Sequence, residues 1–160
     1  MAKFVYYNNN PYGKREEDCV VRAITLASGL PYEEVEHKLW LTAELYNCDR
    51  LCKFCYSNFI KHVLGYKEVN CDDLTVGEFA DKHPIGIYLV RIEGHLTCII
   101  DGVCYDIWNC LDEICDTVWK NSWQTKKNHL HYKYKMIYKE LMHSTRMKRL
   151  SGLITDKSSL

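Results

Sequence analysis

Cys19 is the residue whose position first suggests nucleophilic chemistry. It follows an acidic stretch, residues 16–18, and precedes an apolar run, Val20–Ala27, that ends before Gly29. The run predicts a buried helix, because a helix that is apolar on nearly every face is one that other elements surround. A thiol at a helix N-terminus lies at the positive end of the helix dipole, which favours the thiolate, whereas nearby carboxylates raise its pKa. Cys19 is therefore a candidate nucleophile that needs a further positive charge.

A histidine and a carboxylate that could serve this thiol lie in a predicted β-hairpin. Two runs rich in β-forming residues flank Asp101-Gly102, which is a strong signal for a two-residue turn. With that turn, Thr97 lies opposite Asp106, and His95 lies diagonal to Asp106 on the same face. We expect Asp106 to accept the Nδ1 proton of His95, so that Nε2 takes the proton of Cys19. These are the nucleophile, base and orienting group of covalent catalysis.

The order of these residues resembles that of papain-like cysteine peptidases, and most closely that of short papain-like proteins of phages and bacteria. The stretches that carry the resemblance are Asp18–Ala23, Gly94-His95 and Asp101–Trp108. The resemblance implies an α+β fold with a central helix that bears the cysteine and a later antiparallel sheet. It also implies Cys19 as nucleophile, His95 as base and Asp106 as orienting group.

The sequence departs from papain at the oxyanion hole. The papain glutamine that helps to bind the oxyanion has no counterpart, because residues 1–18 contain no Gln. Asn8, Asn9 and Asn10 are the candidate donors, acting beside the backbone N–H of Cys19. The sequence does not choose among the three.

A second candidate exists for the orienting group. Lys120–Trp123 copies the tetrapeptide around the orienting asparagine of larger papain relatives, which makes Asn121 an alternative. We favour Asp106, because the hairpin itself positions it near His95 whereas an ambiguous segment separates Asn121 from that histidine.

The remaining cysteines raise the question of a metal. Cys48, Cys52 and Cys55 have the spacing of a radical-enzyme iron–sulfur motif, but the same spacing puts them on one face of a predicted helix. We interpret them as packing residues and expect neither metal nor cofactor. The nine cysteines are an odd number in a chain of 160 residues, which argues against a disulfide scaffold and for reduced thiols.

The elements that must position the triad form a helical half and a sheet half. The predicted helices begin near Cys19, Pro31, Asp49 and Thr75, and the predicted strands are residues 85–92, 95–100, 103–108 and 130–139. The helical half covers about residues 19–82 and the sheet half about 85–139, with the active site in the cleft between them. We expect one domain over residues 1–150 and a flexible tail over 151–160.

Composition restricts the functional classes. The 21 basic and 21 acidic residues balance, so net charge predicts neither nucleic acid nor a membrane as partner. No run approaches the 18 or so apolar residues of a membrane span, and we expect a cytoplasmic protein, in the host cell if the gene belongs to a phage. The predicted function is a cysteine peptidase that cleaves a peptide or isopeptide bond of a protein or peptide substrate, including a host protein. The alternatives are transglutaminase- or amidase-type acyl transfer by the same triad, and a non-catalytic binding or inhibitor protein of a phage or mobile element. The oligomeric state is not predicted.

Overall fold

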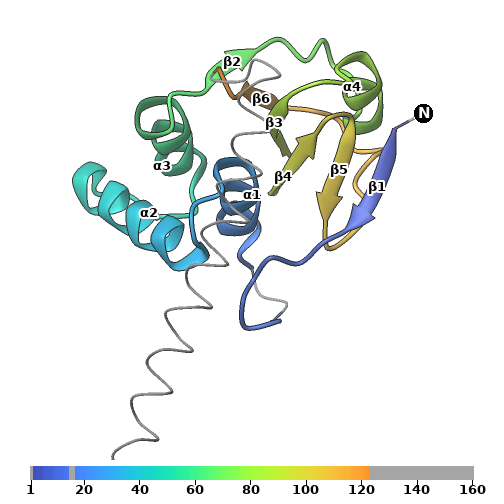
Figure 1. Ribbon diagram of the computed structural model, residues 1–160. Coiled ribbons are helices and arrows are strands. Elements are labelled where there is room, and N and C mark those ends of the chain that lie inside the picture. The colour runs from blue at the N-terminus through green and yellow to red at the C-terminus, as the bar shows by residue number, and fades with distance from the viewer. Residues whose placement is uncertain (1, 15–16, 123–160) are drawn as a thin grey trace, which may run out of the picture. The chain divides into compact units, whose positions relative to one another are not determined.

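The computed structural model describes residues 2–14 and 17–122, and it has mixed α and β structure (Figure 1). The α+β class predicted from the sequence is therefore confirmed for this part of the chain. The predicted strand at 130–139, the tail at 151–160 and the C-terminal limit of the domain lie outside the described residues.

The helices follow the local signals of the sequence in three of four cases. They are α1 (Cys19–Ser28), α2 (Tyr32–Tyr46), α3 (Lys53–Asn58) continued by a π-helical segment (Phe59–Val63), and α4 (Val76–Lys82). Gly29 ends α1 in the left-handed conformation, with φ of 65°. Pro31 directly precedes α2, and Thr75 and Glu78 form the predicted capping box of α4.

The predicted helix from Asp49 to Leu64 is wrong at its start. The Asp49 side chain accepts the Leu51 N–H at 2.7 Å, and Cys52 caps α3 by accepting the Cys55 N–H at 3.4 Å. These side-chain contacts hold residues 49–52 in a turn, because a local acceptor competes with the helical hydrogen bonds. The helix therefore begins four residues later than expected.

The strands of the described residues form one six-stranded mixed sheet. They are β1 (Lys3–Tyr6), β2 (Lys67–Val69), β3 (Ile87–Ile92), β4 (His95–Ile100), β5 (Val103–Asp106) and β6 (Thr117–Lys120), in the order β1-β5-β4-β3-β6-β2. The pair β1–β5 is parallel and the other pairs are antiparallel. The three consecutive strands β3, β4 and β5 were expected, whereas β1, β2 and β6 were not.

The turn between β4 and β5 has the predicted register. Ile100 pairs with Val103, and both turn residues, Asp101 and Gly102, have positive φ (49° and 76°). A two-residue turn with two positive φ values matches the twist of the flanking strands, which explains the Asp-Gly sequence. The register fixes which face of β5 carries Asp106.

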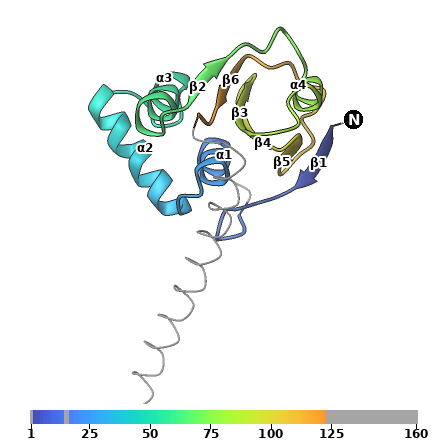
Figure 2. The same ribbon diagram turned by 45° about the horizontal axis from the view of Figure 1, so that its top comes forward.

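Helices pack on both faces of the sheet. Figures 1 and 2 show α1 between α2 and the sheet, while α4 lies across the sheet from α1. The first face packs against α1, α2 and α3 through Ile87, Leu89, Leu96, Cys98 and Trp119. The second face packs on α4 through Tyr88, Val90, Ile92, Ile99 and Val118. Within the helical half predicted for about residues 19–82, α4 therefore packs on the opposite face of the sheet from α1, α2 and α3.

Within residues 2–14 and 17–122, every helix is too short or too polar to cross a membrane.

Candidate active site

Cys19 is the first residue of α1 and remains partly exposed, whereas most of the helix behind it is buried. Val20, Val21 and Ile24 fix the helix in the core against the sheet. The apolar run that predicted a buried helix therefore explains why the thiol is held rigidly at the helix end. This end is also the one where the helix dipole favours an anion.

His95 begins β4 and Asp106 ends β5, and their side chains are hydrogen bonded. His95 Nε2 lies 2.6 Å from Asp106 Oδ2, and the Asp106 side chain is 3% exposed. The expected assignment of the ring nitrogens is wrong, since Nε2 and not Nδ1 contacts the carboxylate. Nδ1 is then the nitrogen available to Cys19. Strand parity defines the face of a side chain but not the rotation of an imidazole ring, so the sequence could not settle this point.

The thiol contacts the beginning of the same strand. Burial raises the pKa of Cys19, but hydrogen bonding to the His95 ring and to the Leu96 backbone, with the positive charges of His95 and Arg22, lowers it below the usual value. Burial likewise lowers the pKa of His95, whereas hydrogen bonds and attraction to Asp106 and Cys19 raise it to about 9. The two shifts together favour the pair of a thiolate and an imidazolium over the pair of a neutral thiol and a neutral ring.

Glu17 and Asp18, the described part of the acidic stretch before Cys19, do not oppose this arrangement as the sequence suggested. Glu17 is exposed, while the buried Asp18 carboxylate receives Arg22 Nε at 2.6 Å, the Tyr32 hydroxyl at 2.8 Å and Asn10 Nδ2 at 2.9 Å. Burial raises the pKa of Asp18, and these donors more than offset it and lower the pKa. The nearest carboxylate is therefore paired with a buried cation instead of acting on the thiol alone.

Trp108 covers one side of the histidine. The Trp108 and His95 rings lie edge to face, with centroids 5.4 Å apart. Trp108 is 41% exposed, so an aromatic side chain that reaches the surface packs against one side of the His95 ring.

The three candidate oxyanion donors have different environments. Asn8 donates to the Lys14 carbonyl at 3.0 Å, and Asn10 is buried against Asp18. Asn9 lines the hollow beside Cys19, where its amide donates to the Arg22 carbonyl at 2.9 Å. Of the three, Asn9 is the one that lines the same hollow as Cys19.

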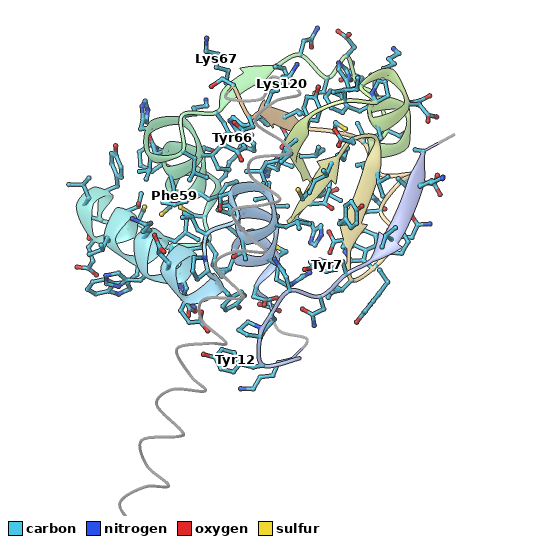
Figure 3. All side chains as sticks on the ribbon, viewed as in Figure 1. Tyr7, Tyr12, Phe59, Tyr66, Lys67 and Lys120 are labelled. Carbon is cyan, nitrogen blue, oxygen red and sulfur yellow. The ribbon has the colours of Figure 1, made fainter. Side chains whose placement is uncertain are left out.

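The hollow lies between the first turns of α1, the ends of β4 and β5, and the segment that follows β1. Its lining residues are Tyr7, Asn9, Cys19, Arg22, Ala23, Leu26, Leu96, Tyr105 and Asp106. Tyr7, labelled in Figure 3, follows β1 and its N–H donates to the Asp106 carbonyl at 2.8 Å. The free volume of the hollow is about 10 Å³, which is room for about one water molecule or one oxygen atom of a substrate.

Asn121 does not contact the histidine in the structure. Its side chain donates to the Tyr66 hydroxyl at 3.2 Å, and Tyr66 in turn donates to the Ala27 carbonyl at the far end of α1. Figure 3 shows Tyr66 well apart from Tyr7. The structure thus brings Asp106, and not Asn121, to His95.

Cys48, Cys52 and Cys55 do not share a helix face as expected, because only Cys55 lies within α3. Cys48 follows α2, Cys52 caps α3 and Cys55 is buried with its Sγ 3.7 Å from the Leu39 carbonyl. The three thiols nevertheless lie close together, since that of Cys48 is hydrogen bonded to those of Cys52 and Cys55. Burial is the main cause that raises the pKa of Cys55, to about 12, which disfavours a thiolate ligand. Across residues 2–14 and 17–122, His, Cys, Asp and Glu side chains form no group of three arranged to hold a metal ion.

Arg22 and Tyr32 are residues of this site that the sequence reasoning did not assign. The signal for Arg22 was present: a charged residue interrupts an otherwise apolar helix, four positions after Asp18 and three after Cys19. Residues three and four apart share a helix face, so the pattern placed a cation beside both. Tyr32 had no comparable signal, because its contact with Asp18 depends on how α2 packs against α1.

Comparison of the chain with protein-family models, with curated proteins and with solved structures found no match in any of the three.

Proposed function

We propose that this protein is a papain-like cysteine peptidase with Cys19 as nucleophile, His95 as proton carrier and Asp106 as orienting group. The observation that carries the proposal is the arrangement of His95, bonded through Nε2 to Asp106 and facing the thiol at the start of a buried helix. A nucleophile, a base within its reach and a group that orients the base form the constellation of covalent acyl transfer. The order of the elements, with the cysteine helix first and the histidine strand later, supports a papain-like fold.

The chemistry follows from the protonation states that the site favours. The Cys19 thiolate attacks the carbonyl carbon of a peptide or isopeptide bond and forms a tetrahedral oxyanion. Collapse breaks the C–N bond, and Nδ1 of the His95 imidazolium gives its proton to the leaving amine. A water molecule then attacks the thioester while His95 accepts its proton, and the C–S bond breaks to release the acid. The Cys19 thiolate and the His95 imidazolium are thereby restored.

Asn9 supports the oxyanion step in this proposal. Its amide lines the hollow beside the thiol, as an oxyanion donor must. The bond from Nδ2 to the Arg22 carbonyl uses one amide hydrogen and fixes the orientation of the group. The second amide hydrogen and the Cys19 backbone N–H are the proposed donors to the oxyanion.

Selective alkylation tests the proposal. At pH 6, iodoacetamide should modify Cys19 before the partly exposed Cys48, Cys52 and Cys71, as followed by intact mass and peptide mapping. Cys19→Ala should abolish the fast phase and His95→Ala should slow it, because the thiolate loses its imidazolium.

His83→Ala is the matched control, since His83 stacks on Phe79 beside α4, and it should leave the rate unchanged. Reaction of Cys19 no faster than that of the other exposed thiols would refute the proposed nucleophile. Fast alkylation without release of amine or acid from peptides would favour a non-catalytic binding role. Transfer of the acyl group to an added amine in preference to water would instead favour the transglutaminase type.

A further inference from the structure

Arg22 is a buried cation that joins two buried carboxylates. Its side chain is 6% exposed, with Nε 2.6 Å from Asp18 Oδ1 and Nη1 3.2 Å from Asp106 Oδ1. A buried charge is costly unless it is paired, and a charge that bridges two partners is fixed in position by both. The guanidinium therefore ties the start of α1 to the end of β5.

The two oxygens of Asp106 have separate partners. Oδ1 receives Arg22 Nη1 and the Ile107 N–H, the latter at 2.7 Å, while Oδ2 receives His95 Nε2 at 2.6 Å. With Oδ1 held from two directions, rotation of the carboxylate is blocked and Oδ2 points at the imidazole. Burial raises the pKa of Asp106, but its hydrogen bonds and the charge of His95 lower it, so the carboxylate stays ionised.

We infer that Arg22 is a positioning residue of the site, anchored by Asp18, that aims Asp106 at His95 and supplies part of the positive charge that stabilises the Cys19 thiolate. The inference rests on the proposed function and adds to it a charged group outside the triad. Because Arg22 is on the same helix as the nucleophile, its contact with Asp106 holds the helix that carries Cys19 against the strand that carries Asp106.

The planar fork of arginine is required for this role. Nε and Nη1 reach two carboxylates in different directions, whereas a lysine ammonium is a single point on a flexible stem. The titratable groups that surround Arg22, Asp106, His95 and Cys19, together with those four, are Asp18, Tyr32, Tyr56, Cys98 and Cys110. Of these, Cys19 and His95 are the groups whose ionisation should report the loss of Arg22 near neutral pH.

The test is the pH dependence of Cys19 alkylation in Arg22→Gln, measured from pH 4 to 10 with iodoacetamide. We expect the rise in rate to move to higher pH, so that the rate at pH 6 falls about tenfold, the change for a pKa higher by about one. Arg22→Lys should give an intermediate profile because it keeps the charge without the fork. Arg50→Gln, which removes an exposed arginine paired with Glu36, is the matched control and should keep the wild-type profile.

A double-variant cycle separates positioning from a general effect on folding. If Arg22 acts through Asp106, the effects of the two substitutions should not be additive. Adding Arg22→Gln to the Asp106→Asn protein should then lower the alkylation rate by less than about threefold, whereas Arg22→Gln alone lowers the rate of the wild type about tenfold. Independent, multiplying losses would overturn the positioning role of Arg22, and an unchanged pH profile in Arg22→Gln would overturn both the positioning role and the charge that it supplies to the thiolate. If wild-type Cys19 shows no selective alkylation, the proposed function fails first and the role assigned to Arg22 fails with it.

Discussion

Replacing Asp106 tests the electrostatic basis of the site most directly. Burial alone lowers the pKa of His95, and the hydrogen bonds and charges of Asp106 and Cys19 raise it from 6.5 to about 9. That change corresponds to about 3 kcal/mol of preference for the charged ring. Asp106→Ala removes the strongest of the favourable contacts. In Asp106→Ala the imidazolium should therefore lose its proton at lower pH than in the wild type, and the Cys19 thiolate, without that charge beside it, should form only at higher pH.

The size of the effect follows from the two pKa values. At pH 7.5 a ring with a pKa of about 9 is almost fully charged, whereas a ring with a pKa of 6.5 or less is charged in about one molecule in ten. Alkylation of Cys19 at pH 7.5 should therefore fall by about tenfold in Asp106→Ala. Asp106→Asn should lose less, because an amide oxygen still accepts the His95 N–H without supplying a charge.

The assay is the alkylation rate of Cys19 against pH, with near-UV circular dichroism to show that each variant remains folded. The second measurement is needed because Asp106→Ala also removes one of the two partners of the buried Arg22, and breaking such a pair costs about 3–5 kcal/mol. A folded Asp106→Ala protein with the wild-type pH profile would refute the reasoning, since Asp106 would then have no part in charging His95.

Three further predictions follow from the same contacts. Asn9→Ala should slow acylation of Cys19 by an activated ester about 100-fold and leave alkylation by iodoacetamide within twofold, because alkylation forms no oxyanion; equal loss in both reactions would contradict an oxyanion role. Asn121→Ala should leave the alkylation profile unchanged and lower the free energy of unfolding by about 1 kcal/mol through the lost bond to Tyr66, measured by urea denaturation. Because folding lowers the pKa values of Asp18 and Asp106, both carboxylates should stabilise the folded protein above about pH 3.8, and this stability should be lost as pH falls through their pKa values in the folded state. In Asp18→Asn the free energy of unfolding should therefore decrease less over the same acidic pH range.

Local signals explain which parts of the fold the sequence could predict. Gly29, the Thr75 capping box and the Asp101-Gly102 turn each act over a few residues, and each is present in the structure where expected. The β1 strand was missed because its four residues pair in parallel with β5, about 100 positions later, and three of them are exposed without alternation. Non-local pairing of a short strand leaves no periodic pattern to recognise.

The same distinction applies to the site. The hairpin register brought His95 near Asp106 through local geometry, so that hydrogen bond could be predicted from the spacing of the residues. The choice among Asn8, Asn9 and Asn10 could not be predicted from the sequence, because all three lie in an irregular segment whose path depends on contacts with α1. Ring orientation at His95 was similarly inaccessible, since it depends on where Cys19 lies relative to the end of β4.

The effect of Asp18 on the Cys19 thiol in the structure is opposite to the effect that the sequence suggests. In the sequence, Asp18 is a negative charge beside a thiol, and it should disfavour the thiolate. In the structure it anchors Arg22, which then faces Asp106 and contributes to the lowered pKa of Cys19. The charges alternate along the contacts, from Asp18 to Arg22, Asp106, His95 and Cys19, so each buried ion neighbours one of opposite sign. A second negative charge can therefore lie beside the nucleophile without opposing it, provided that the arginine between the two carboxylates remains.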